Sequence, residues 1–173
     1  KNTQIDATGA LVTNSDPNRA GGTLTIRNLH TTQTDIALFT GQRLSNDQVY
    51  IPEDLRAHGT LSGSLNNLLV NLAVVTSDGT IALNGRFTNL AHPNAATYAA
   101  TVKTNSLDIG SILRNDQLTT ISADLTATGR GFTPEQMDTH LRGSIYSFGY
   151  NGYVYRNINL DGNVRGNTFE VTT

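Results

Sequence analysis

The side chains in this chain that could carry out catalysis or bind a metal ion are histidines, serines and carboxylates. Ser64 and Ser144 each follow a glycine, but both lie in strand-like patterns rather than in a nucleophile elbow. The carboxylates are scattered over turns and polar strand positions. The four histidines are far apart and lack partners at metal-ligand spacing: His30, His58, His92 and His140. We therefore expect no catalytic residues, no metal and no cofactor, and predict that the chain is not an enzyme.

Composition narrows the possible partners. The chain has 173 residues, which suits one domain, and a formal net charge of -2 with no basic run. Because phosphate binding needs clustered Lys and Arg, we expect no nucleic-acid partner. The chain has no cysteine, which excludes disulfides and cysteine metal sites. It has no apolar run of about 18 residues, the length needed for a membrane-spanning helix.

One alternating pattern recurs along the chain and would form the scaffold for any site. Its first copy is Ile5-x-Ala7-x-Gly9-x-Leu11, and it returns at 55–61, 81–87 and 158–164, with partial copies at 125–129 and 141–145. An apolar period of two predicts strands with one apolar face. The glycine falls on that face each time, which marks a bulge, a bend or a close approach to the backbone. The pattern predicts a curved, repetitive β structure.

The alternation gives a set of expected elements. Two short helical turns are expected, at 107–113 with Ser106 as its cap, and at 133–136. A turn at 51–54 should introduce the strand that follows it. The expected strands are 4–13, 22–29, 34–39, 55–65, 68–74, 81–87, 98–102, 121–127, 139–148, 158–164 and 168–173.

Two dipeptides predict tight hairpins. Asp78-Gly79 is typical of a two-residue type I′ turn, and this turn would place Val70 opposite Phe87 and Leu72 opposite Gly85. In that register Val74 would face Leu83. The apolar residues of both strands would then share one face.

Asn151-Gly152 predicts a second hairpin, with Tyr150 opposite Tyr153 and Phe148 opposite Tyr155. Alternation places Ile145 and Ile158 on one face and a group of aromatic residues on the other. This aromatic face either stabilises the strand pair or offers a stacking platform for a sugar or a partner protein. Its members are Tyr146, Phe148, Tyr150, Tyr153 and Tyr155.

The apolar face itself has two interpretations. It could close on itself as a sandwich or flattened barrel, or it could stay open as a groove for hydrophobic cargo. The candidate groove residues are Leu55, Ala57, Leu61, Leu68, Val70, Leu72, Val74, Ile81, Leu83, Phe87, Tyr98, Ala100, Val102, Ile121, Ala123, Leu125, Leu141, Ile145, Ile158, Leu160 and Val164.

Several passages resemble a known family. Residues 51–65, with a proline, two acidic residues and then Gly59-Thr60-Leu61-Ser62-Gly63-Ser64-Leu65, are similar to the TamB / AsmA-like family of Gram-negative envelope proteins. Residues 76–87, 107–113 and 124–132 fit the same family. The closest match is 143–162, which resembles the versions found in Bacteroidetes. The resemblance extends from residue 51 to residue 173, and the first fifty residues share only the general pattern.

This resemblance implies an all-β fold, in which one long curved antiparallel sheet forms an elongated apolar groove. Residues 1–173 would be a single groove segment of a longer, repetitive periplasmic protein, anchored in the inner membrane by a helix outside this segment. The family is implicated in phospholipid transport to the outer membrane and in outer-membrane protein assembly. Implied partners are phospholipid acyl chains or unfolded outer-membrane protein strands, and an outer-membrane barrel of the Omp85 type. The alternative is a secreted or periplasmic glycan- or ligand-binding β-domain that uses the aromatic face.

Overall fold

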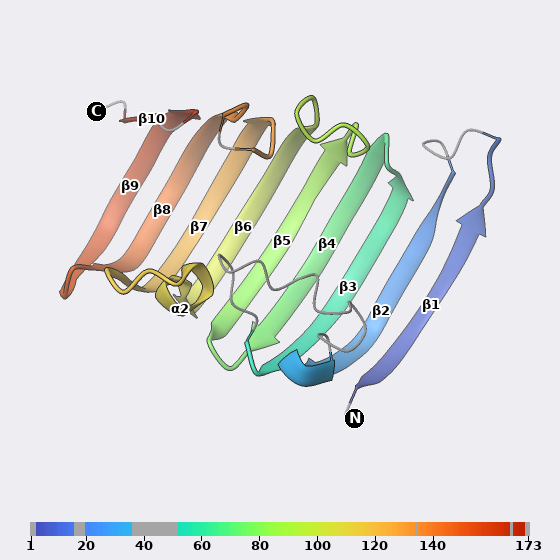
Figure 1. Ribbon diagram of the computed structural model, residues 1–173, viewed down its shortest axis with the longest axis horizontal. Coiled ribbons are helices and arrows are strands. Elements are labelled where there is room, and N and C mark those ends of the chain that lie inside the picture. The colour runs from blue at the N-terminus through green and yellow to red at the C-terminus, as the bar shows by residue number, and fades with distance from the viewer. Residues whose placement is uncertain (1–2, 16–19, 36–51, 134, 167, 172–173) are drawn as a thin grey trace.

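The protein is a single curved antiparallel sheet. A computed structural model describes residues 3–15, 20–35, 52–133, 135–166 and 168–171, and ten strands follow one another in chain order across the sheet (Figure 1). A short helix, α2 (Ile109–Leu113), joins two of them. The strands are β1 (Gln4–Val12), β2 (Gly21–Thr32), β3 (Asp54–Ser64), β4 (Asn67–Thr76), β5 (Gly79–Thr88), β6 (Thr97–Asp108), β7 (Leu118–Arg130), β8 (Asp138–Tyr150), β9 (Tyr153–Arg165) and β10 (Thr168–Val171). The expected all-β class and long curved sheet are confirmed.

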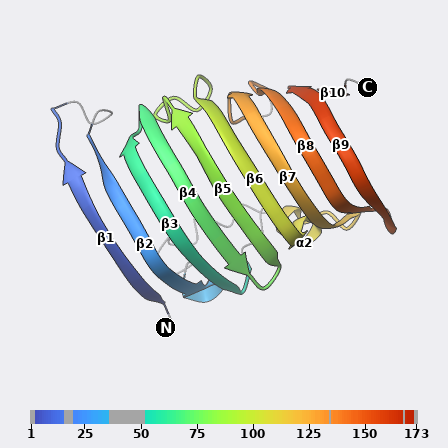
Figure 2. The same cartoon turned by 180° about the vertical axis from the view of Figure 1, so that it is seen from behind.

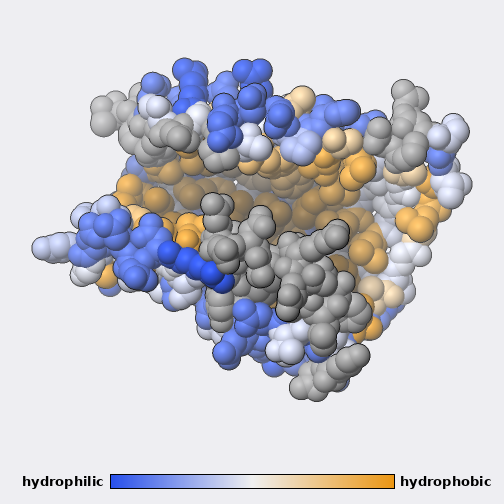
Figure 3. Space-filling view, in the orientation of Figure 1, coloured by the Kyte–Doolittle hydropathy of each residue, from blue (hydrophilic) through white to orange (hydrophobic). Residues whose placement is uncertain are grey.

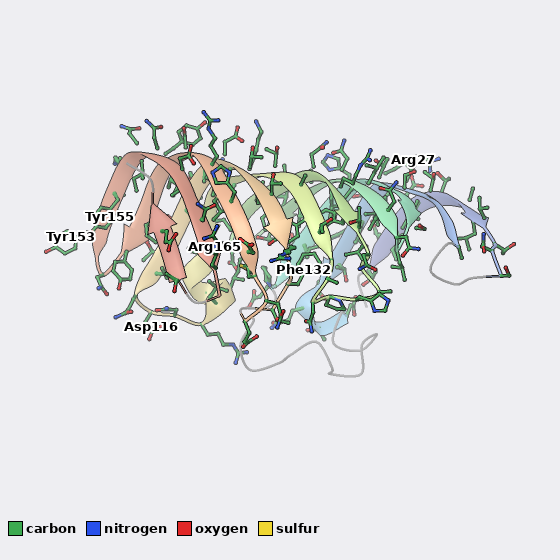
Figure 4. The ribbon with its side chains drawn as sticks, turned by 90° about the horizontal axis from the view of Figure 1, so that it is seen from above. Arg27, Asp116, Phe132, Tyr153, Tyr155 and Arg165 are labelled. Carbon is green, nitrogen blue, oxygen red and sulfur yellow. The ribbon has the colours of Figure 1, made fainter. Side chains whose placement is uncertain are left out.

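Strand register gathers the apolar residues on one face. Leu61 of β3 pairs with Leu24 of β2 on one side and with Val70 of β4 on the other. Directly paired residues point to the same side of a sheet, so the alternation of each strand stays in phase with its neighbours. This face is the inner side of the arch, where hydrophobic residues line the hollow in Figure 3. Side chains ending in nitrogen and oxygen cover the outer side (Figure 4).

The inner face is not closed by a second layer of described residues. Among these residues, no large side chain is fully buried, and the buried apolar residues are mostly small, such as Ala57, Ala100 and Ala123. A closed sandwich would bury Leu, Val and Phe between its two sheets. The described part of the chain is instead one sheet whose apolar side lines an open trough.

Glycines on the inner face allow neighbouring backbones to approach. Gly143 has φ +147, and a Cβ built on it would lie 2.1 Å from the carbonyl oxygen of Asp124. Gly59 has φ +150, and its Cβ would lie 2.0 Å from the carbonyl oxygen of Asn71. Neither position tolerates a side chain, because the backbone conformation and the space both exclude one. Gly143 pairs in regular register with Leu125 and Leu160, so it serves close approach. Gly59 pairs with Ile26 beside the register shift between Ile26 and Leu29 of β2, so it serves close approach next to a bulge.

Most expected strands form, with differences at three segments. Thr34 and Asp35 lie in a helical turn rather than a strand, and 36–39 lie outside the described residues, as does Ile51 of the expected turn at 51–54. Helix α2 is capped by Asp108, which accepts a hydrogen bond from Ser111 N at 3.0 Å, and not by Ser106. Residues 107 and 108 stay in β6, since Leu107 is buried in the sheet. The expected helical turn at 133–136 is a hydrogen-bonded turn, with residue 134 outside the described set.

In the first predicted hairpin, the apolar residues of both strands share one face as predicted, but the predicted register is wrong. The turn residues are Ser77 and Asp78, so Thr76 pairs with Gly79 and Leu72 pairs with Leu83. A type I′ turn needs positive φ at both central residues, but here the positive φ falls on Gly79, at +119. The Thr76 hydroxyl accepts a hydrogen bond from Asp78 N at 3.0 Å, which holds this alternative turn. The pairs Val70–Phe87, Leu72–Gly85 and Val74–Leu83 are therefore wrong by two residues.

The second predicted hairpin is confirmed. Tyr150 pairs with Tyr153 and Phe148 with Tyr155. Both turn residues have positive φ, 49 at Asn151 and 77 at Gly152, as a type I′ turn requires.

A candidate hydrophobic groove

Every residue predicted to line the groove lies on the inner face by register. Across the middle of the sheet, Ala57, Val74 and Ile81 are consecutive partners, as are Leu83 and Val102. The same rows continue to the last strands, where Leu160 faces Gly143 and Ile158 faces Ile145. The apolar face therefore runs without interruption from β3 to β9.

Strands β1 and β2 extend this face, although none of their residues is among the candidates above. Ile5 pairs with Leu29, Leu11 pairs with Gly22, and Leu24 pairs with Leu61. The alternation of residues 5–11 in the sequence indicated this apolar face of β1. The exposed fraction of Leu11 is 90%, so this end of the trough is its most open apolar surface.

Leucines and glycines alternate across β1–β3 and leave a hollow between them. One row reads Leu11, Gly22, Gly63 and the neighbouring row reads Gly9, Leu24, Leu61. Leu65 and Leu68 complete the wall of a hollow of about 620 Å³. Glycine in one row and leucine in the next leave a recess bordered by methyl groups, which suits an apolar ligand.

Three aromatic rings form a cluster on the inner side, near the end of β7. Phe132 lies in the β7–β8 loop (Figure 4). Its ring stacks on Tyr98 with centroids 5.2 Å apart and on Phe87 with centroids 6.4 Å apart. Two backbone hydrogen bonds hold the loop, from Phe132 N to Pro93 O at 3.2 Å and from Gly131 N to Ala96 O at 2.9 Å. The Tyr98 hydroxyl also bonds to Thr139 Oγ1. Phe132 follows Gly131 in a loop without alternation, so the pattern gave no indication of this cluster.

The five aromatics predicted to share a face do not all do so. Ile121 pairs with Phe148 and Ala123 pairs with Ile145, so β8 holds one extra residue there, Tyr146. This bulge places Phe148 and its partner Tyr155 on the apolar side with Ile145. Tyr146 instead interacts with Lys103, whose ion pair with Asp124 lies on the outer face. Alternation alone does not reveal a bulge.

The remaining aromatics continue the trough to its far end. The rings of Phe148 and Tyr150 stack with centroids 6.3 Å apart and 7° between planes. Tyr153 and Tyr155 lie at the end of the arch on β9 (Figure 4), with exposed fractions of 70% and 47%. These four aromatics therefore belong to the apolar inner surface rather than to a separate platform.

Cross-strand ion pairs lie on the outer face. Lys103 Nζ lies 2.6 Å from Asp124 Oδ2, and the two residues are direct partners in β6 and β7. The hydrogen bond from the Lys103 ammonium to Asp124, followed by their charge attraction, raises the pKa of Lys103 above its ordinary value. Arg142 and Asp161 are likewise direct partners, 3.7 Å apart. These two ion pairs place their charges on the face opposite the trough.

Two of the described histidines each lie against an aspartate. His30 Nε2 lies 2.6 Å from Asp54, and His140 Nε2 lies 2.7 Å from Asp161. In the described ranges, no three His, Cys, Asp or Glu residues meet closely enough to hold a metal ion. Nor does any helix in those ranges combine the length and the hydropathy that crossing a membrane requires. The chemistry available to the inner face is the burial of apolar surface.

Comparison of the chain with protein-family models, with curated proteins and with solved structures finds no match.

Proposed function

We propose that the inner face holds hydrophobic cargo, with phospholipid acyl chains as the primary ligand. The observation that carries this proposal is a continuous apolar face, from Leu11 of β1 to Val164 of β9, with no second layer of described residues against it. Exposed apolar area of this extent is costly in water and marks a surface that binds something. Each methylene of an acyl chain that it removes from water contributes about 0.8 kcal/mol.

In an open trough, the backbone N–H and C=O groups of the interior strands keep their hydrogen-bond partners. Antiparallel ladders satisfy the N–H and C=O groups of the interior strands, so the trough floor presents only side chains. The curvature brings the side chains of distant strands toward one cargo. A chain of this kind shields lipid by lining its path rather than by enclosing it.

The resemblance to the TamB / AsmA-like family gives this binding a setting. In that setting the chain is a periplasmic segment of an inner-membrane-anchored protein. It supports phospholipid transport to the outer membrane, outer-membrane protein assembly, or both, together with a barrel partner of the Omp85 type. Unfolded outer-membrane strands are the competing cargo, since β1 and residues 153–161 of β9 have a described partner on one side only.

Photocrosslinking at neighbouring positions tests the proposal. Leu68 lies on the inner face opposite Phe87, and Leu69 lies on the outer face opposite Arg86. A photoreactive amino acid at 68 should capture phospholipid in bacterial envelopes, whereas the same group at 69 should not. Equal capture at both positions, or capture of protein strands alone at 68, would overturn acyl chains as the cargo.

A further inference from the structure

Among the described residues, most cations of the outer face are neutralised by aspartates. Arg27 meets Asp6 at 2.6 Å, and Asp138 meets both Arg130 at 3.5 Å and Arg165 at 3.4 Å. With Arg56, Lys103 and Arg142, which also have aspartate partners, these pairs leave little free charge on this side of the arch.

Arg86, in the middle of β5, is an exception. It is exposed, and among the described residues no carboxylate oxygen lies within 4.0 Å of its guanidinium. Its cross-strand partners are Leu69 and Ala99, which carry no charge. A guanidinium has five N–H donors in a planar fork, so Arg86 keeps its full capacity to bind an anion.

Figure 2 views the sheet from its outer side. A hollow of about 570 Å³ lies on this side, beside Arg86. No Asp or Glu lines this hollow. A row of hydroxyl and amide side chains crosses it, each residue being the direct partner of the next: Thr60, Asn71, Asn84, Thr101 and Thr126. Five neighbouring strands place the ends of this row about 19 Å apart. A second hollow of about 520 Å³ adjoins Arg86 toward Thr88 and Thr128.

We propose that this outer surface binds an acidic saccharide, with its carboxylate or phosphate group on Arg86. The hydroxyl and amide row supplies donors and acceptors to several sugar hydroxyls at once, and the guanidinium binds the anionic group through two parallel hydrogen bonds. Among the described residues, Arg86 is the one unpaired cation that lines this hollow, which is too little charge for a nucleic acid, because nucleic-acid binding requires clustered charge. The site lies on the face opposite the groove, so it is independent of the proposed lipid binding.

Calorimetric titration of the full chain with a tetramer of galacturonic acid tests this site, with a neutral tetramer of galactose and with inorganic phosphate as comparisons. We expect binding of the acidic tetramer, and affinity at least about tenfold lower for Arg86→Gln, the loss of one charged hydrogen-bonding group. Arg156→Gln is the matched control, because Arg156 is also exposed and has no carboxylate within 4.0 Å among described residues. It should leave the affinity unchanged.

A second variant tests the sugar contacts apart from the charge. Asn84→Ala should weaken the acidic tetramer while Arg86 remains in place. Three results would overturn the proposal: no binding of the acidic tetramer, equal losses in Arg86→Gln and Arg156→Gln, or phosphate binding as tightly as the tetramer.

Discussion

Leu72 of β4 and Leu83 of β5 are direct cross-strand partners on the inner face, at the middle of the trough. Asn71, one residue before, pairs with Asn84 on the outer face. Residues 71 and 72 therefore lie on opposite faces of the sheet, and matched substitutions at these two positions can distinguish the roles of the two faces. A carboxylate at 72 would stand among apolar groups, while one at 71 would stand in water.

Leu11→Asp should reduce lipid binding without destabilising the fold. Because Leu11 is 90% exposed and belongs to an edge strand, the free energy of unfolding should change by less than about 0.5 kcal/mol. The carboxylate would still face the hollow of β1–β3, so the amount of co-purified lipid should fall. Thr8→Asp, on the outer face opposite Thr25, is the control and should retain lipid. Equal lipid content in the two variants would place the cargo elsewhere.

Gly143→Ala should destabilise the sheet by more than about 2 kcal/mol. The methyl group would meet the carbonyl oxygen of Asp124, and alanine disfavours φ +147. Gly9→Ala is the comparison, because its Cβ would lie 3.1 Å from Thr23 O without a positive φ, and its loss should be smaller. Urea unfolding monitored by circular dichroism gives both values. Similar losses would show that Gly143 is not needed for close strand approach.

Phe132→Ala should lower the free energy of unfolding by about 1–2 kcal/mol, because it removes the stack on Tyr98 and half-buried apolar area. Phe132→Tyr keeps the ring and should lose much less. Urea midpoints of the two variants provide the measurement. Midpoints that fall together would contradict a stabilising role for the stacked ring.

Asp124→Asn should lower the pKa of Lys103 toward its ordinary value, since the hydrogen bond to Asp124 is the main cause of the rise. A raised folded-state pKa stabilises the fold below the unfolded-state pKa, and this contribution disappears as pH rises through the folded-state pKa. The contribution of this ion pair is therefore fully present near neutral pH and is lost only at alkaline pH. NMR titration of the Lys103 side chain in the wild type and in Asp124→Asn measures the pKa. An unchanged pKa in the variant would contradict this assignment.

The strands could be predicted from alternation because each strand has one apolar face, and the Asn151–Gly152 hairpin because its residues adopt the φ values that this dipeptide favours. The register of the first hairpin was not predictable from Asp78-Gly79 alone, since the Thr76 hydroxyl stabilises a different turn. A bulge also breaks the alternation: Phe148 lies on the inner face, away from Tyr146, because β8 carries an extra residue. Phe132 reaches the groove from a loop, where no periodicity exists.

Native mass spectrometry of the chain purified from a bacterial host, with lipid extraction and identification, tests the groove most directly. We expect phospholipid bound to the wild type and to Asn71→Asp, and its loss from Leu72→Asp while the β-sheet circular dichroism spectrum is retained. A lipid-free wild-type chain, or a Leu72→Asp variant that keeps its lipid, would contradict the account.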